Sequence, residues 1–253
     1  MANKVFELRE FFHLTFLRHF SYRLTGRAYA VKGGICMRFF HRSSRLSADM
    51  DFDVLSQIGV GTLRKAVDTV LESGALLNNL GVQGILRISA TKPKQTTITQ
   101  RWKVILYPQG EPIQTKIEFS RRKNEMHYEV GVPHLEIISR YKCMQFAAQF
   151  YDGKQMVEQK IKALAAPGRN AVRDLFDLHH LIFGMTIDLA KATEGVDRRE
   201  LEFAIEKMED FSFKDFVEQV RPYLTEELVV AYSENKNFER IKNETSGKLF
   251  ELL

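Results

Sequence analysis

Apolar residues recur with a helical period at both ends of the chain and alternate with polar residues in its middle. Residues 1–24 are rich in Phe and Leu with charged residues between them, which predicts an amphipathic helix that packs on a domain. Residues 30–55 predict a short apolar strand, a turn, an apolar-faced helix, a basic loop and a second strand. Residues 61–78 carry apolar positions at helical spacing, which predicts a helix that covers a sheet and ends near Gly74 or Asn78.

Between residues 84 and 130 the pattern changes to alternation and is enriched in Thr, Ile, Val and Tyr, which is typical of strands. Pro93 and the segments 108–110 and 121–124 are expected to break this region. We therefore expect successive antiparallel strands over residues 85–88, 98–107, 113–120 and 127–130. Residues 144–151 are expected to form a last strand.

Beyond residue 152 the periodicity is helical. Pro167-Gly168 separates a helix expected over residues 153–165 from one over residues 169–183. The tail predicts four more helices, two of them capped by Ser212 and Thr225, over residues 197–208, 212–220, 225–233 and 238–252. The chain is therefore expected to be α+β, with a mixed β-sheet and flanking helices in a domain of residues 1–151 and a helical bundle in residues 152–253.

The formal net charge of +5 hides an asymmetry along the chain. Residues 197–253 contain 9 Lys and Arg against 14 Asp and Glu, a net charge of −5, so residues 1–196 carry +10. A basic region favours a polyanionic ligand such as a nucleoside triphosphate or RNA, although an ordinary solvated surface has the same composition.

Two cysteines, Cys36 and Cys143, are a poor basis for a disulfide framework, and a reducing cytoplasmic compartment is expected. The charges within the first 24 residues argue against a signal peptide or a membrane span. Binding at a membrane surface is the alternative to packing on the domain. The seven histidines show no spacing of a zinc site.

The main candidate chemistry lies at Gly33-Gly34 and at Asp49, Asp51 and Asp53. Residues i and i+2 of a strand project to one face, so Asp49 and Asp51 can share a site. Paired carboxylates anchor Mg²⁺, and two such ions about 3.5–4 Å apart can clamp the oxygens of a nucleotidyl transfer. Glycines let backbone N–H groups approach phosphates closely. The plainer interpretation is a turn followed by a solvated strand end.

Two further clusters carry ionisable side chains. Lys116 and Glu118 share one face of a predicted strand, where a surface charge pair is the plainer interpretation. Lys160 lies on a predicted helix, and Asp174 and Asp177 lie three residues apart on one face of the next helix. Taken alone, Lys160 reads as a solvated helix lysine.

The paired glycines followed by D-x-D resemble the signature of the DNA polymerase β-type nucleotidyltransferase superfamily. The sequence VKGGICMRFF...RLSADMDFDV is similar to the AbiEii/AbiGii toxin family within it, which has LKGGTxLR followed by RxSxDLDF. Met50 replaces a Leu of that pattern, and Ile35 replaces the small hydroxyl residue that often follows the glycines. The matching residues are Lys32, Gly33, Gly34, Arg38, Arg45, Ser47, Asp49, Asp51 and Phe52.

A second pair of motifs in that family, EKLxAL and RxxxRDxxDL, is matched by QKIKAL, with Gln159 in place of Glu, and in full by RNAVRDLFDL. The resemblance spans residues 28–181. It implies that Lys160 binds a triphosphate, that Asp174 orients Lys160 or the acceptor, and that Asp177 supports them. It also implies a third carboxylate on a strand beside the D-x-D strand, and Glu118 is the candidate.

The resemblance thus implies a nucleotidyltransferase-type sheet domain that transfers a nucleoside monophosphate from an NTP to a hydroxyl, with Mg²⁺, two ions being expected and Mn²⁺ a possible substitute. The implied active site lies in a groove between the sheet region and the helical region. The implied metal ligands are Asp49, Asp51 and Glu118. The implied catalytic residues are Asp49, Asp51, Glu118, Lys160 and Asp174. The implied nucleotide-binding residues are Lys32, Gly33, Gly34, Arg38, Ser47, Lys160 and Asp177.

Proteins of this family act as toxins of toxin–antitoxin or phage-defence pairs, some of them by adding nucleotides to tRNA, so an RNA acceptor and a cognate antitoxin are implied. Residues 42–45 and 121–123 together with Arg169 are expected to form a phosphate-binding rim for RNA. A protein hydroxyl or a small molecule stays open as the acceptor. The alternative is a protein that has kept the fold, lost the chemistry and binds nucleic acid or a partner.

Overall fold

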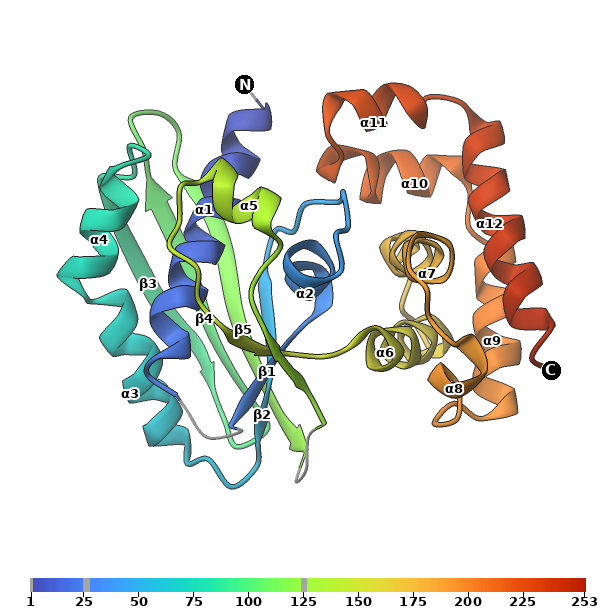
Figure 1. Cartoon of the computed structure of the whole chain (residues 1–253), viewed down its shortest axis with the longest axis horizontal. Coiled ribbons are helices and arrows are strands. Elements are labelled where there is room, and N and C mark those ends of the chain that lie inside the picture. The colour runs from blue at the N-terminus through green and yellow to red at the C-terminus, as the bar shows by residue number, and fades with distance from the viewer. Residues whose placement is uncertain (1, 25–27, 124–126) are drawn as a thin grey trace. The chain divides into compact units, whose positions relative to one another are not determined.

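A computed structural model describes residues 2–24, 28–123 and 127–253 of the chain (Figure 1). The chain forms two compact units. Unit 1 comprises Met1–Arg42 and Leu46–Tyr151, and unit 2 comprises Ser43–Arg45 and Asp152–Leu253. The α+β class expected from the sequence is confirmed, because unit 1 contains a mixed sheet with helices and unit 2 is helical.

Unit 1 is built on one seven-stranded sheet with the strand order β3-β4-β5-β2-β1-β7-β6. β2 pairs in parallel with β5, and β1 with β7, whereas the other neighbours are antiparallel. The expected run of successive antiparallel strands holds for β3, β4 and β5, whereas β6 pairs with β7 at the opposite edge. The strands are β1 (Tyr29–Lys32), β2 (Met50–Leu55), β3 (Arg87–Gln95), β4 (Thr99–Tyr107), β5 (Ile113–Lys123), β6 (Glu129–Gly131) and β7 (Ala148–Phe150).

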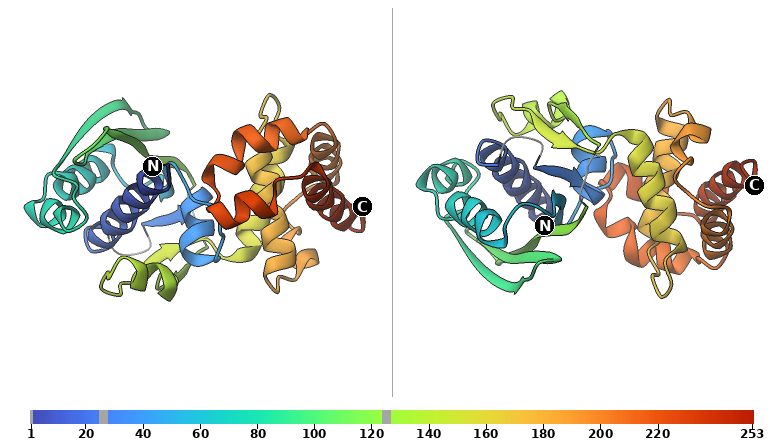
Figure 2. Two further views of the ribbon diagram at one scale, coloured as in Figure 1. Left: turned by 90° about the horizontal axis from the view of Figure 1, so that it is seen from above. Right: turned by 90° about the horizontal axis from the view of Figure 1, so that it is seen from below.

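The helices of unit 1 are α1 (Ala2–Ser21), α2 (Gly33–Phe40), α3 (Val60–Leu71), α4 (Gly74–Gly81) and α5 (Leu135–Arg140). The curved part of the sheet formed by β3, β4 and β5 wraps around α1, α3 and α4 (Figure 2). Phe20 of α1 meets Phe52 and Phe119 of the sheet with ring centroids 5.7 and 5.3 Å apart. α1 is therefore a core element, as expected. Among the described residues no helix combines the length and the apolar character needed to cross a membrane.

Some elements of unit 1 differ from the expectation. The helix expected from residue 61 ends at Leu71, near the first of its two expected ends, and α4, which was not expected as a separate helix, begins after the extended Ser73. Pro93 lies inside β3 instead of ending a strand. β3 is an edge strand with an irregularity between Thr91 and Lys94, so the missing N–H of proline interrupts no ladder on its outer side. The sequence pattern also missed α5.

Unit 2 consists of helices around an apolar core. Its centre is an aromatic cluster in which Phe216 meets Phe176, Tyr232 and Phe238 at 5.3–6.1 Å between ring centroids. Ser212 caps its helix in a reciprocal capping box, as expected, whereas the Thr225 side chain makes no capping bond. The helices are α6 (Gly153–Ala165), α7 (Val172–Gly184), α8 (Leu189–Ala192), α9 (Arg198–Glu209), α10 (Phe213–Gln219), α11 (Glu226–Ala231) and α12 (Asn235–Phe250), with a 3₁₀ turn at Arg221–Tyr223.

Candidate active site

In the turn from β1 into α2, the backbone of Gly33 lies in close contact with the Asp51 side chain. Gly33 has a φ of +66°, and a Cβ at this position would lie 3.0 Å from Asp51 Oδ2. Both the positive φ and the close approach require glycine. Lys32, the last residue of β1, pairs with Asp51 across the antiparallel ladder. The first glycine of the predicted motif therefore defines the space in which the Asp51 carboxylate lies.

Asp51 is flanked on its own strand by two apolar residues, Met50 and Phe52, that point into the core. Burial raises the pKa of the Asp51 carboxyl, Lys116 and Lys32 oppose this rise, and Asp49 and Glu118 add to it. A half-buried carboxylate with like charges beside it is a ready ligand for a cation, because a cation offsets both the burial and the repulsion.

Asp49 lies one residue before β2, and the backbone around it is held by two hydroxyl groups. Ser47 donates a hydrogen bond to the Asp49 carbonyl at 2.9 Å, and Thr115 of β5 donates one to the Ala48 carbonyl at 2.8 Å. His13 of α1 lies 2.7 Å from the Thr115 hydroxyl through Nε2. Burial lowers the pKa of His13 to about 3, so its ring is neutral. Because the Thr115 hydroxyl donates to Ala48, Nε2 of His13 carries the proton and donates to it.

Lys116 of β5 lies among the candidate metal ligands. Its ammonium is 3.4 Å from Asp49 Oδ2 and 3.8 Å from Glu118 Oε2. Glu118 pairs directly with Asp51 in the parallel ladder, and its carboxylate also accepts a hydrogen bond of 2.5 Å from Arg101 Nε on β4. The strand register thus brings Glu118 beside Asp51, as expected for a third carboxylate, but two cations of the sheet already neutralise it.

Asp53, the third aspartate of β2, has a different environment. It is buried, it accepts a hydrogen bond of 2.6 Å from Lys32 Nζ, and it accepts another of 2.7 Å from the Tyr151 hydroxyl. Burial raises the pKa of Tyr151, and the charge of Asp53 adds to this rise, so the phenol stays protonated. Asp53 therefore anchors Lys32 at the start of α2, and the predicted binding of a nucleotide by Lys32 stays a prediction.

Arg38 of α2 forms an ion pair with Glu10 of α1. Its Nε donates to Glu10 Oε1 of α1 at 2.5 Å, and the Tyr141 hydroxyl donates to Glu10 Oε2 at 2.8 Å. The Glu10 side chain is 5% exposed and that of Arg38 is 12% exposed. The guanidinium therefore fixes α2 on α1, and direct contact between Arg38 and a nucleotide stays a prediction.

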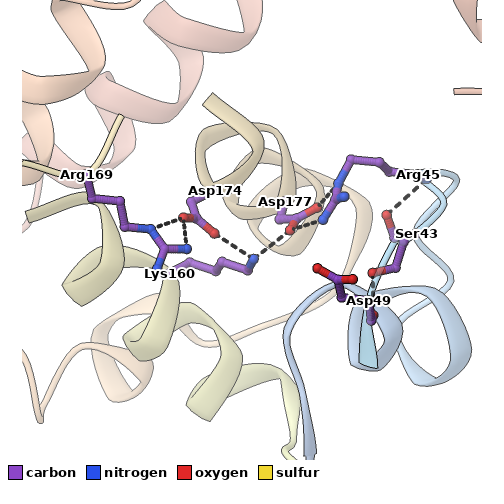
Figure 3. Close-up of polar contacts among 8 residues, drawn as sticks. Ser43, Arg45, Asp49, Lys160, Arg169, Asp174 and Asp177 are labelled. Atoms are coloured by element: carbon purple, nitrogen blue, oxygen red, sulfur yellow. Dashed lines mark hydrogen bonds and ion pairs between the residues drawn. The ribbon is translucent and has the colours of Figure 1, made fainter. Parts of the chain in front are cut away.

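The second cluster lies within unit 2 and joins five charged side chains (Figure 3). Lys160 of α6 donates to Asp174 at 2.8 Å and to Asp177 at 2.6 Å, both on α7. Arg45 donates to both oxygens of Asp177, at 2.8 and 2.7 Å. Arg169, just before α7, donates to Asp174 Oδ2 at 2.7 Å. The order along this cluster is therefore Arg169, Asp174, Lys160, Asp177 and Arg45.

The ionisable groups of this cluster shift the pKa values of one another. Burial alone would raise the pKa of Asp177, but Arg45 and Lys160 outweigh it and hold this pKa well below its usual range. Burial alone would lower the pKa of Lys160, but Asp174 and Asp177 outweigh it and raise this pKa. Lys160 is thus fully charged at neutral pH although only 6% of it is exposed. Asp177 has no exposed side-chain surface, so in this structure it holds the two cations.

The predicted phosphate-binding rim is wrong for two of its arginines. Arg45 and Arg121 are each only 5% exposed, and Arg45 is paired with Asp177. Arg42 is exposed, and Arg169 is half exposed beside Asp174. The side chains of residues 122 and 123 and residue 124 lie outside what the structure describes. The sequence carried no signal for burial of Arg45, because its partner Asp177 lies 132 residues away.

Asp49, Asp51 and Glu118 are the carboxylates implied as ligands of a cation. In residues 2–24, 28–123 and 127–253 no three His, Cys, Asp or Glu side chains converge as a metal-holding group. Asp49 and Asp51 fit Mg²⁺ in chemistry, because this ion takes one or two carboxylates and completes its shell with water and phosphate oxygens. The third ligand, Glu118, stays a prediction, since Arg101 and Lys116 hold it here.

Two solved structures from Helicobacter pylori share this fold. JHP933 is 19% identical, with a TM-score of 0.56, and the match covers 96% of this chain and 91% of that one. A second structure, described as a proposed nucleotidyltransferase, has the same identity and TM-score, with 95% and 96% covered. At this identity the likeness shows the fold. No curated protein matches the chain.

The particular family follows from the sequence match. Residues 15–240 match the model of a family described as nucleotidyl transferase AbiEii toxins of type IV toxin–antitoxin systems. This span contains both clusters described above. The chain belongs to the AbiEii family, and the resemblance seen in its motifs is confirmed.

Proposed function

We propose that this toxin is a Mg²⁺-dependent enzyme of the cytoplasm that transfers a nucleoside monophosphate from an NTP to a hydroxyl of RNA, with tRNA as the first candidate acceptor and a cognate antitoxin as its partner. The observation that carries the proposal is the Asp51 carboxylate, half-buried and held against the Gly33 backbone, with Asp49 beside the same lysine. The family supports the class of enzyme and the antitoxin.

The reaction forms one bond and breaks one. The acceptor oxygen attacks the α-phosphorus, and the bond from that phosphorus to the oxygen bridging to the β-phosphate breaks. Pyrophosphate leaves with the electron pair, and the proton of the acceptor hydroxyl passes to solvent water. Mg²⁺ held by Asp49 and Asp51 would supply positive charge to the phosphate oxygens. The chain positions these carboxylates through Ser47, Thr115 and the turn at Gly33.

Lys160 is proposed to bind the triphosphate. An ammonium has three N–H donors, and two of them contact Asp174 and Asp177, which leaves one for a phosphate oxygen. The two carboxylates keep Lys160 protonated, so its charge does not depend on the phosphate. Asp174 orients it, and Asp177 holds it together with Arg45. That the site lies in a groove between the sheet region and the helical region stays a prediction.

The test is transfer of label from each α-labelled NTP to total RNA with Mg²⁺. Asp51→Ala is expected to lower incorporation by at least 10³-fold, which corresponds to a loss of about 4 kcal/mol of transition-state stabilisation. The matched control is Asp68→Ala on α3, a carboxylate on the other side of the sheet that contacts Lys92 and Trp102. Unchanged transfer by the Asp51→Ala protein would reject the site.

A second function is favoured by one observation. Glu118 is neutralised by Arg101 and Lys116, which suits a fold that has lost its chemistry and binds nucleic acid or a partner. Calorimetry with each NTP and Mg²⁺ separates the two functions, because the enzyme needs NTP binding and the binding module does not. No heat with any of the four NTPs would favour the second function.

A further inference from the structure

The sheet of unit 1 has a face that its helices leave open. Trp102 of β4 points toward α3, where its Nε1 donates to Asp68, so the residues next to Trp102 point to the opposite face. Lys103 of β4 and Thr91 of β3 are register partners on that face, and both are exposed. Among the described residues of unit 1, no helix lies on the outer side of β3, β4 and β5 (Figure 2).

The charged residues of this face are mostly basic. The register places Lys94 opposite Arg101, Arg87 opposite Tyr107 and Lys103 opposite Lys116. Among the described side chains of β3, β4 and β5, the cations on this open face are Arg87, Lys94, Arg101, Lys103 and Lys116, and the one carboxylate is Glu118. Glu118 is already paired with Arg101 and Lys116. The face therefore carries an excess of positive charge, which we call the basic sheet face.

The basic sheet face leads directly to the candidate metal ligands. β5 is the neighbour of β2, and Glu118 pairs with Asp51 in the ladder. Four adjacent strands span about 14 Å from β3 to β2 at a strand spacing of about 4.8 Å. A chain of phosphates laid across β3, β4 and β5 would thus end beside the Asp51 carboxylate.

Protection of a sheet edge accounts for only part of this charge. Lysine and proline on an edge strand prevent pairing with other chains. This protection of the edge is enough to explain the presence of Lys92, Pro93 and Lys94 on β3. It does not account for Lys103, which lies on β4 between two hydrogen-bonded neighbours. Arg87 also stacks its guanidinium 3.9 Å from the centroid of the Tyr107 ring, which holds it on the open face.

A nucleic acid fits this surface better than an acidic protein. The centre of a protein interface is depleted of charge and enriched in apolar and aromatic residues. Ile105 and Tyr107 are the apolar residues of β4 on this face, and both are half-buried. Cations with a single aromatic ring are instead typical of surfaces that follow a phosphate backbone.

We propose that the basic sheet face binds the phosphate backbone of the RNA acceptor and directs its terminal hydroxyl toward Asp51. The choice of RNA rests on the proposed function, whereas the location of the surface rests on the strand register and the exposed cations. Lys103 and Lys94 contact phosphates, and neither belongs to the metal site. This surface is distinct from the rim predicted from the sequence.

The test measures RNA binding apart from chemistry. Labelled bulk tRNA is titrated with the full chain by fluorescence anisotropy, without NTP or Mg²⁺, at salt from about 0.05 to 0.2 M. The double variant Lys94→Thr/Lys103→Thr removes two charges and keeps residues that favour strands. The double variant Arg64→Ala/Lys65→Ala removes two exposed charges from α3, on the other face of the sheet, and is the matched control.

The Lys94→Thr/Lys103→Thr protein is expected to bind tRNA about ten-fold more weakly, with a salt dependence reduced by about one to two in the slope of log K against log salt. The control is expected to bind as the unchanged chain does. Equal binding of tRNA by both double variants would overturn the proposal and would favour an acidic protein as the ligand of the basic sheet face. NTP binding by the unchanged chain is measured in parallel. If the unchanged chain binds no NTP, the proposed function fails, whatever the tRNA result is.

Discussion

At the scale of single residues, the charged form of the Asp51 carboxylate lowers the stability of the fold, and it is also the form that the proposed cation site needs. Its half-buried carboxylate lies beside Asp49 and Glu118, which disfavours its charged form, and a cation would relieve this cost. Lys116 supplies part of that relief in the structure, since it lies near Asp49 and Glu118 and opposes the rise in the pKa of Asp51. The charged form of Asp51 therefore costs the fold stability, and the proposed binding of a cation would offset that cost.

The first prediction concerns the pH dependence of stability in Asp51→Asn. A carboxyl whose folded pKa is raised stabilises the fold fully below its unfolded pKa, and this contribution is lost as pH rises through the folded value. At neutral pH the charged Asp51 thus lowers the free energy of unfolding. We expect Asp51→Asn to raise the melting temperature in EDTA at pH 7.5, with a gain that shrinks toward pH 4.

Differential scanning calorimetry checks this prediction, with added Mg²⁺ as the second variable. An ion at 100 times its Kd stabilises the folded chain by about 2.7 kcal/mol, so Mg²⁺ is expected to raise the melting temperature of the unchanged chain and not that of Asp51→Asn. A variant that melts below the unchanged chain at pH 7.5 in EDTA would show that Asp51 stabilises the fold, contrary to its raised pKa.

The partners of these residues could be predicted only where they lie close in sequence. Lys116 and Glu118 share a strand face because they are two apart, so their proximity follows from the period of a strand. Arg101 reaches Glu118 only through the register of β4 and β5, which periodicity does not determine. Tyr151 contacts Asp53 across 98 residues. Spacing and the family resemblance therefore identified the candidate carboxylates but not the groups that neutralise or hold them.

At the scale of elements, local signals predicted most helices and strands. α6 forms over the expected residues 153–165, because its apolar stripe is bounded by the Asp152 capping box and by Pro167. The errors occurred where no local signal exists. A separate helix, α4, forms after the extended Ser73, and Pro93 is tolerated because tertiary pairing makes β3 an edge strand. These outcomes depend on neighbours that a single sequence does not reveal.

The junction of β1 and α2 gives a prediction at this scale. Gly33→Ala places a side chain at φ +66°, which costs about 1–2 kcal/mol, and brings its Cβ to 3.0 Å from Asp51 Oδ2. We expect a loss of at least that free energy of unfolding, together with weaker Mg²⁺ binding, because the Asp51 carboxylate must move. Urea denaturation and calorimetry with Mg²⁺ measure the two effects.

The control for this junction is Gly61→Ala in α3, where a Cβ would meet no atom within 4 Å. Alanine is the better helix former, so this change is expected to be neutral or to stabilise by about 0.5–1 kcal/mol. If Gly33→Ala and Gly61→Ala had the same stability and the same affinity for Mg²⁺, the close approach of the turn to Asp51 would be contradicted.

At the scale of the whole molecule, the chain enters unit 2 twice. Residues 43–45 belong to unit 2 although the segments before and after them belong to unit 1. Arg45 completes the partners of the fully buried Asp177, 132 residues further along the chain. The helical unit is therefore not a simple C-terminal segment, because one of its buried ion pairs needs a residue from the first fifth of the sequence.

Arg45→Met is expected to lower the free energy of unfolding of unit 2 by about 3 kcal/mol, because it leaves Asp177 buried with Lys160 as its remaining strong partner. Two probes locate the loss. Trp102, the single tryptophan, reports on unit 1 through its fluorescence, and the circular dichroism of the helices reports on both units. We expect the circular dichroism midpoint in urea to fall and the fluorescence midpoint to fall less.

Arg42→Met, three residues earlier and exposed, is the matched control, and equal stability of the two variants would contradict the structural function of Arg45.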